Sequence, residues 1–232
     1  MNILCTICCR GGSKGIKNKN IRIVHGKPLM AHTIETAKQW GQYTNLIVST
    51  DSSEIMEAAR NYGADVPFAR PQELANDTSG KVAVVRHALQ AMEEIHQIRY
   101  DYVVDLDATS PLRSVADIAK AVEHCVTNKL DIVYSVNEAR KNPYFNMVEL
   151  DAQGYPHLCK QLPSSVLSRQ TAPKVYELNA SIYVYERSFL LEAQTVFSEK
   201  AGIYVMERSA IDIDEEDDLV YLEYIMKQRS NI

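Results

Sequence analysis

The chain has 232 residues, 46% of them hydrophobic, and a formal net charge of −5. This length and hydrophobic content suffice to bury a core without disulfide or metal support, so we expect a single domain over residues 1–232. The mild acidity disfavours a nucleic-acid-binding protein, which carries a basic face. The sequence contains no run of about 18 apolar residues, the length that a membrane-spanning helix needs. Five cysteines, an odd number, indicate a reducing cytoplasm, and the six histidines lack zinc-ligand spacing.

Strand-like and helix-like stretches alternate along the chain. Residues 3–9 form a continuous apolar run, which predicts a strand buried on both faces and not a signal peptide. Cys5 and Cys8 point to opposite faces of such a strand, so their C-x-x-C spacing predicts buried thiols and no metal site. The other expected strands are 45–51, 102–108, 131–136, 180–186 and 203–207, and the expected helices are 28–40, 52–63, 81–95, 115–127 and one from residue 215 onward.

This alternation predicts a mostly parallel sheet flanked by helices, a Rossmann-like α/β fold. In such folds ligands bind at the carboxyl ends of the strands. Residues 10–22, RGGSKGIKNKNIR, directly follow the first expected strand and are called the basic loop below. We therefore expect the basic loop to form part of a ligand site.

The basic loop carries five cationic side chains and three glycines, and no acid precedes Glu35. Backbone N–H groups of a glycine-rich turn can hold phosphates, and Lys and Arg add positive charge. The loop matches neither the Walker A pattern nor G-x-G-x-x-G, which disfavours an ordinary ATPase or dehydrogenase. The alternative is a solvated basic turn, but the position after a buried strand favours a phosphate site.

An acid-rich stretch, SAIDIDEEDD at 209–218, contains a second candidate site. In an extended segment Asp212 and Asp214 point to one face with Cα atoms about 6.5–7 Å apart, while Ile213 faces the core. Both carboxylates could then reach one Mg²⁺ ion. Attraction of acids to a helix N-terminus accounts for residues 215–218 but not for the two aspartates that precede the helix.

The stretch DLDATSPLR at 105–113 ends a strand and turns into a helix start. Two interpretations of its D-x-D pair remain open. Asp105 and Asp107 could hold a metal, as in nucleotide-sugar glycosyltransferases, or Asp107 could contact a sugar hydroxyl while Asp105 is structural. 

From residue 140 to residue 178 the alternation breaks. The segment holds several prolines and a short strand pair, FNMVEL at 145–150 before a DAQG turn, but no helical period. A structureless loop of this length is improbable inside a compact domain. We expect an excursion that packs on something else, such as a second subunit.

Several motifs occur together in one order: ICCRGGSKGIKNKNI, VSTDSSEI, ARPQELANDTS, LDATSPLR, SRQ followed by ELNASIYVY, and IDIDEEDDL. In this order they resemble the acylneuraminate cytidylyltransferases, the CMP-sialic-acid synthetase family, up to about residue 220. The resemblance implies a Rossmann-like nucleotidyltransferase fold and a cytoplasmic homodimer. It implies Mg²⁺-dependent transfer of CMP from CTP to the anomeric hydroxyl of a nine-carbon nonulosonic acid, with release of pyrophosphate.

The resemblance also assigns residues. The implied nucleotide contacts are Arg10, Ser13, Lys14, Lys19, Asn20, Arg70, Ser79 and Lys81. The implied sugar contacts are Asp107, Arg169, Gln170, Asn179 and Tyr183. Arg10, Lys14, Lys19, Asp212 and Asp214 are the expected catalytic residues, the two aspartates as Mg²⁺ ligands. The 140–178 segment matches the dimerisation insertion, which reaches into the partner's site.

Two positions depart from the family pattern. Sialic-acid members usually carry Gln where this chain has Asp107, and often Lys where it has Phe145. A carboxylate in place of an amide changes which sugar the pocket accepts, so legionaminic, pseudaminic and N-acetylneuraminic acid all remain candidates. Two other functions remain open as well, a glycosyltransferase that uses the D-x-D pair and a nucleotide-binding module without turnover. The sequence names no group that takes the hydroxyl proton.

Overall fold

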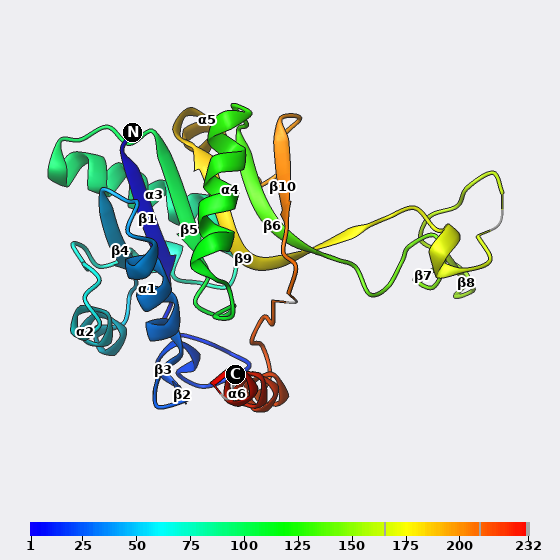
Figure 1. The fold of residues 1–232 in the computed structure, drawn as a ribbon, viewed down its shortest axis with the longest axis horizontal. Coiled ribbons are helices and arrows are strands. Elements are labelled where there is room, and N and C mark those ends of the chain that lie inside the picture. The colour runs from blue at the N-terminus through cyan, green and yellow to red at the C-terminus, as the bar shows by residue number, and fades with distance from the viewer. Residues whose placement is uncertain (165, 209, 231–232) are drawn as a thin grey trace.

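The computed structural model describes residues 1–164, 166–208 and 210–230. Position 165, in the expected excursion, position 209, at the start of the acid-rich stretch, and positions 231–232 lie outside the described residues. A six-stranded sheet forms the centre, in the order β10-β6-β9-β5-β1-β4 (Figure 1). Its strands are β1 Ile3–Cys8, β4 Asn45–Ser49, β5 Tyr102–Leu106, β6 Ile132–Glu138, β9 Tyr176–Glu186 and β10 Ala201–Val205.

Strand β1 lies inside the sheet, parallel to β4 on one side and to β5 on the other. Strand β10 runs parallel to β6, whereas β9 runs antiparallel between β5 and β6. The expected mostly parallel sheet is confirmed, with one antiparallel strand inside it. Residues 3–7 of β1 are all buried, which explains their apolar run, because both faces of this strand are covered.

Helices cover both faces of the sheet, as the alternation predicts. One core cluster joins the sheet to α1 through Ile34 and to α4 through Ile118, and the other joins it to α3 through Leu89 and to α5 through Leu190. The helices are α1 Leu29–Trp40, α2 Ser53–Asn61, α3 Lys81–His96, α4 Val115–Thr127, α5 Arg187–Glu192 and α6 Glu216–Ser230.

A third, smaller core cluster ties the basic loop to the C-terminal helix. Ile16 of the loop packs with Leu29 of α1, with Ile213 of the acid-rich stretch and with Leu222 of α6. Ile213 is fully buried, as its place between two aspartates predicts. This cluster holds the acid-rich stretch against the basic loop.

Some element boundaries differ from the expectations. The hairpin of β2 (Ile23–Val24) and β3 (Lys27–Pro28) and the short helix α5 were not predicted, because each is too short to show a period. Strand β9 begins at residue 176 and not at 180, since its first residues pair with the end of β6 outside the core and are exposed. Strand β10 covers 201–205 and not 203–207, because Ala201 and Gly202, poor strand formers, pair with β6.

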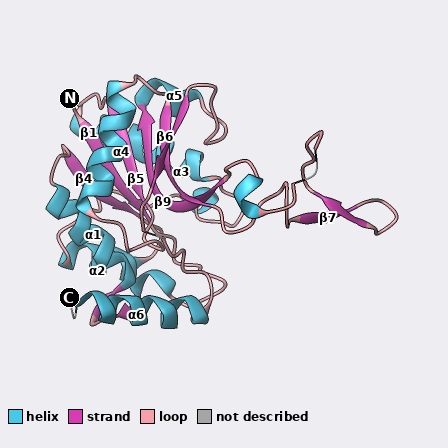
Figure 2. Cartoon of the chain, turned by 45° about the vertical axis from the view of Figure 1, so that its right-hand side comes forward, coloured by secondary structure: helices cyan, strands magenta, loops and turns pink. Residues whose placement is uncertain are grey.

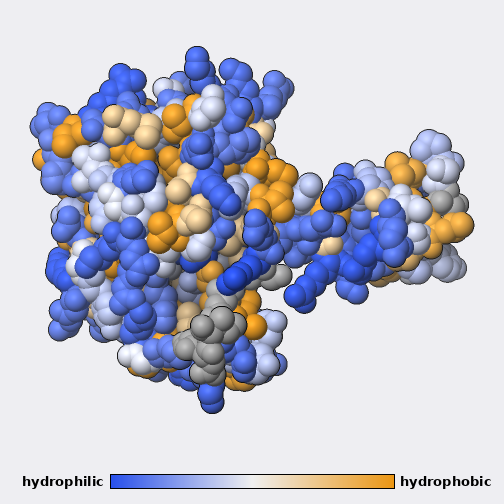
Figure 3. Space-filling view, in the orientation of Figure 1, coloured by the Kyte–Doolittle hydropathy of each residue, from blue (hydrophilic) through white to orange (hydrophobic). Residues whose placement is uncertain are grey.

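Residues 139–175, called the arm below, project away from the sheet between β6 and β9 (Figures 1 and 2). The expected strand pair is confirmed as the hairpin of β7 (Val148–Leu150) and β8 (Pro156–Leu158). Hydrophobic side chains lie among hydrophilic ones on the arm surface (Figure 3), and Leu150 is 69% exposed. Among the described residues, no helix combines the length and apolar character needed to cross a membrane.

Candidate functional site

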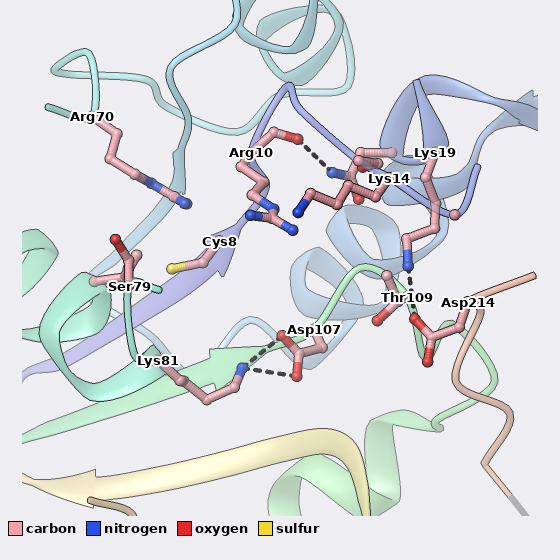
Figure 4. Close-up of a pocket in the computed structure, with 14 residues that line it drawn as sticks. Cys8, Arg10, Lys14, Lys19, Arg70, Ser79, Lys81, Asp107, Thr109 and Asp214 are labelled. Atoms are coloured by element: carbon pink, nitrogen blue, oxygen red, sulfur yellow. Dashed lines mark hydrogen bonds and ion pairs between the residues drawn. The ribbon is translucent and has the colours of Figure 1, made fainter. Parts of the chain in front are cut away.

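A cavity of 440 Å³ opens at the carboxyl ends of β1 and β5, beside the first turn of α3 (Figure 4). This is the edge of the sheet where the basic loop was expected to form a site. All eight residues assigned to the nucleotide line the cavity, and so do Asp107 and Asp214. The remaining lining residues are Cys8, Gly15, Val84 and Thr109.

The cavity has two chemically distinct ends. Figure 4 shows Arg70 and Ser79 at one end and Lys19 and Asp214 at the other, with the side chain of Arg10 between them. Arg70 is buried, and its Nε donates to Ser49 Oγ at 3.2 Å, so its guanidinium is fixed by the sheet. An elongated polyanion could lie along this line, with its negative groups on the basic loop.

Three contacts shape the basic loop around the cavity. The backbone N–H of Gly11 donates to Asp51 Oδ1 at 2.9 Å, and the side chain of Asn20 donates to the carbonyl oxygen of Arg10 at 3.1 Å. Asn20 is nearly buried, so it closes the loop from within. An added Cβ at Gly15 would overlap the carbonyl oxygen of Asp214, so only glycine allows the loop to approach the acid-rich stretch this closely.

Asp77 lies across the cations of the basic loop. Its Oδ1 is 2.6 Å from Arg10 Nη1, and its Oδ2 pairs with Lys14 Nζ. Hydrogen bonds from Lys14 and Arg10 lower the pKa of the Asp77 carboxyl. One carboxylate thus bridges two cations, which is the arrangement that a phosphate group would also adopt there.

The acid-rich stretch meets the cavity through Asp214. Lys19 Nζ lies 3.1 Å from Asp214 Oδ1 and also donates to the carbonyl oxygen of Ile213. The backbone N–H of Ile213 donates to the carbonyl oxygen of Thr109 at 2.9 Å, which ties this stretch to the turn after β5. Desolvation raises the pKa of the Asp212 carboxyl, and the charge of Asp214 raises it further, whereas a hydrogen bond from Thr109 lowers it.

At the base of the cavity one lysine holds two carboxylates. Lys81 Nζ lies 3.0 Å from Asp105 Oδ2, and 2.6 and 2.8 Å from the two carboxylate oxygens of Asp107. Thr6 Oγ1 donates to the other oxygen of Asp105 at 2.7 Å. Burial opposes the charge of Lys81, but the two aspartates outweigh it and raise the pKa of Lys81. Desolvation raises the pKa of the Asp107 carboxyl, although the charge of Lys81 opposes the shift.

A buried arginine fixes the turn that carries Asp107. The guanidinium of Arg113 donates to Ser181 Oγ at 3.0 Å, to Thr33 Oγ1 at 2.9 Å and to the backbone carbonyl of Asp107. Burial lowers the pKa of Arg113 to about 10, and the nearby charge of Asp107 opposes that shift. The turn after β5 is therefore anchored from below, which leaves the Asp107 side chain to face the cavity.

Several assigned residues lie outside this cavity. Arg169 and Gln170 are on the arm and line a separate recess there. Asn179 is buried and bonds to Ser135 Oγ and Asn137, and Asp212 lines a neighbouring hollow. Tyr183 is buried beneath the base of the cavity, its ring centroid 4.6 Å from Lys81 Nζ. Their roles stay predictions.

Sequence reasoning missed four residues of the site. All four lie within the quoted motifs, but their roles follow only from contacts that the fold creates; they are Asp77, Gly15, Thr109 and Arg113. The signal for Gly15 was present, since a glycine in a loop often marks a close backbone approach. Cys5 is buried as predicted, but Cys8 is only half-buried and lines the cavity.

The comparisons with known proteins agree with this geometry. The family model described as cytidylyltransferase matches residues 4–229. A Campylobacter jejuni protein named CMP-N,N'-diacetyllegionaminic acid synthase is 43% identical over 98% of this chain and 96% of that protein. A Campylobacter coli protein named post-translational flagellin modification protein B is 42% identical over the same shares. A solved structure of CMP:2-keto-3-deoxy-manno-octonic acid synthetase complexed with CTP aligns over 99% of this chain and 100% of that chain, with a TM-score of 0.72 and 16% identity, a likeness of fold.

Proposed function

This chain belongs to the cytidylyltransferase family, and on that premise we propose that it transfers CMP from CTP to the anomeric hydroxyl of a nine-carbon nonulosonic acid. Pyrophosphate is the second product. The observation that carries the proposal is the cavity itself, where loop cations, a buried arginine and two carboxylates line one continuous space. A triphosphate needs the cations, and the carboxylates suit a divalent ion or a sugar hydroxyl.

In this proposal the chain acts mainly by positioning and charge neutralisation. The cationic side chains of Arg10 and Lys14 hold the triphosphate once it displaces Asp77. Arg70 and Ser79, at the opposite end from Lys19, hold the cytosine, and Ser13 and Asn20 complete the loop contacts. The sugar hydroxyl attacks the α-phosphate, and the negative charge that develops on pyrophosphate is met by the loop cations.

The pair Asp212 and Asp214 fits a magnesium ion by its chemistry. Two carboxylates flank a buried isoleucine. Desolvation raises the pKa of the Asp212 carboxyl, the charge of Asp214 adds to the shift, and a bound cation would oppose both effects. Within the described residues no group of three or more His, Cys, Asp or Glu side chains gathers as a metal cage. Phosphate oxygens and water would therefore complete the shell, as is usual for Mg²⁺. When bound, Mg²⁺ neutralises charge on the triphosphate.

We place the sugar acid beside Asp107 and propose a legionaminic-type acid as the natural substrate. The proposal is supported by the 43% identity to a protein named for that sugar. It is also supported by the carboxylate at position 107, which accepts hydrogen bonds and cannot donate them. The natural sugar should therefore present a donor at this point.

A glycosyltransferase with a D-x-D metal site is the less favoured alternative. Asp105 is fully buried, and the ammonium of Lys81 already lies between the carboxylates of Asp105 and Asp107. A metal ion at this pair would have to displace the half-buried ammonium of Lys81. The acid-rich stretch, whose Asp214 faces the cavity, is the better metal site.

We also propose a homodimer in the cytoplasm. The arm leaves the fold and exposes hydrophobic side chains such as Val148 and Leu150, which a second copy could cover. The recess that contains Arg169 and Gln170 lies on the arm, away from the cavity of its own chain, so these two residues could act only in a partner's site. All five cysteines are free, which suits a reducing compartment.

A substrate panel tests the proposed function. The wild-type chain is supplied with CTP, Mg²⁺ and one acid at a time: legionaminic, pseudaminic, N-acetylneuraminic or the eight-carbon KDO. We expect CMP-sugar and pyrophosphate in equal amounts, with the highest kcat/KM for a legionaminic acid. Release of a nucleoside diphosphate would support the glycosyltransferase, and CTP binding in calorimetry without product from any acid would indicate a nucleotide-binding module.

A further inference from the structure

The ammonium of Lys81 has no donor left for the nucleotide. It carries three N–H groups, and three carboxylate oxygens lie within 3.0 Å of it, one from Asp105 and two from Asp107. The ring of Tyr183 also lies 4.6 Å away and provides a cation–π contact from below. Although the resemblance assigns Lys81 to the nucleotide, its ammonium therefore binds the carboxylates of Asp105 and Asp107.

The two carboxylates differ in what remains open to a ligand. Asp105 is fully buried and accepts from Thr6 on one oxygen and from Lys81 on the other. The side chain of Asp107 is 16% exposed and lines the cavity. A carboxylate offers about four acceptor positions, of which Lys81 occupies two. Asp107 thus presents its remaining lone pairs to the cavity.

The backbone beneath Asp107 is also fixed. The guanidinium of Arg113 donates to the carbonyl oxygen of Asp107. The backbone N–H of Asp107 donates to the carbonyl oxygen of Ser181 at 3.3 Å. With the backbone held from below and both oxygens held by Lys81, the Asp107 side chain keeps one orientation.

We propose that Lys81 is a positioning residue, which holds the Asp107 carboxylate so that it accepts a hydrogen bond from a hydroxyl or amide N–H of the sugar acid. This inference rests on the proposed function. The two residues act as one unit, because Lys81 both orients the acceptor and places a positive charge between the adjacent carboxylates of Asp105 and Asp107. The unit determines which sugar acid is accepted, and the nucleotide is held elsewhere.

The test is a double-mutant cycle on steady-state parameters for the sugar acid and for CTP. Lys81→Met should raise KM for the sugar acid at least about tenfold, equivalent to 1.4 kcal/mol, while KM for CTP stays within about twofold. Lys81→Arg should recover part of the loss, since it restores the charge. In an Asp107→Asn background, Lys81→Met should add less than about threefold, because the residue that it positions has already changed.

Thr6→Val is the matched control. It removes a buried hydrogen bond to the same carboxylate pair, but on the Asp105 side, and it should lower the melting temperature without changing the KM for the sugar acid. If Lys81→Met does not fold, the KM values for the sugar acid and for CTP are compared in Lys81→Arg and Asp107→Asn instead. Lys81→Arg keeps the positive charge, and Asp107→Asn removes one of the two acids that Lys81 neutralises.

The outcomes separate the inference from the proposed function. A wild-type chain that forms no CMP-sugar from any acid overturns the function, and the inference with it. A wild-type chain that turns over, combined with a Lys81→Met protein whose CTP parameters change and whose sugar parameters do not, overturns only the inference. Equal losses from Lys81→Met with and without Asp107→Asn would also overturn it, since they would show no coupling.

Discussion

Gly15 lies so close to the backbone carbonyl oxygen of Asp214 that an added Cβ would overlap it. We expect Gly15→Ala to push the basic loop away from the acid-rich stretch and to lower kcat at least about tenfold, with an overpacking cost of about 1–3 kcal/mol in stability. Steady-state kinetics and thermal melting measure the two effects. Gly12→Ala is the control, since nothing lies within 4 Å of a Cβ there, and it should keep the wild-type melting temperature. Equal melting temperatures for both variants would contradict the contact.

Asp214 is expected to be essential to turnover and dispensable to folding. Asp214→Asn keeps the size of the side chain but replaces a carboxylate by a poor Mg²⁺ ligand. We expect less than a tenth of the wild-type kcat, a barrier increase of more than about 1.4 kcal/mol, and an unchanged circular dichroism spectrum. Asp217→Asn, an exposed acid in the first turn of α6, should retain the wild-type rate. A comparable loss in the two variants would remove Asp214 from the metal site.

The ion pairs of Asp77 predict opposite effects of two substitutions on CTP binding. Lys14→Ala removes a cation from the loop and should weaken CTP binding about tenfold. Asp77→Asn removes the carboxylate that CTP must displace from Arg10 and Lys14, so it should strengthen binding a few-fold at low salt and less at high salt. Calorimetry at two ionic strengths measures both. Weaker binding in the Asp77→Asn protein would mean that Asp77 contacts the ligand itself.

The pair of Glu93 and Arg187 fixes the far end of α3 and predicts a pH-dependent stability. Two hydrogen bonds of 2.7 and 2.9 Å from Arg187 lower the pKa of the Glu93 carboxyl. A depressed pKa stabilises the fold above the unfolded-state value of about 4.3, and the contribution is lost as the pH falls through the folded-state pKa. We expect Glu93→Gln to cost about 1–2 kcal/mol at pH 7 and less at pH 3, below the unfolded-state value.

Urea unfolding of wild type and variant at both pH values measures this difference. Exposed Glu94 provides the control, because Glu94→Gln should leave stability unchanged at either pH. A cost for Glu93→Gln that persists undiminished in acid would assign the effect to packing and not to the charge pair.

The proposed dimer depends on the hydrophobic surface of the arm. Leu150 is 69% exposed in the single chain, and Leu150→Glu should place a charge in the interface between two copies. We expect the mass measured by light scattering to change from dimer to monomer, and activity to fall with it, because Arg169 would lose access to a partner's cavity. Gln153→Glu, in the exposed turn of the same hairpin, should remain dimeric. A wild-type monomer with full activity would reject the proposal.

The sequence predicted those features that depend on residues close together in the chain. An apolar run that ends in a cationic, glycine-rich stretch placed the basic loop at a strand end, and alternation placed Ile213 in the core between two aspartates. It could not predict that β9 lies between β5 and β6, because strand order depends on contacts far apart in the chain. For the same reason the sequence did not predict that Lys81 binds Asp107, 26 residues away, or that Asp77 forms an ion pair with the basic loop.

The position of β9 inside the sheet determines when the sheet can close during synthesis of the chain. Both neighbours of β6 in the sheet, β9 and β10, are made after it, so β6 leaves the ribosome with two unsatisfied edges. The β9 strand ends 48 residues later, which at about 5–20 residues per second leaves the β9 edge open for roughly 2–10 s, and the β10 edge stays open longer because β10 follows β9. A nascent chain that stops at residue 175 should therefore be sensitive to protease and prone to chaperone capture, whereas one that extends through β10 can close its sheet.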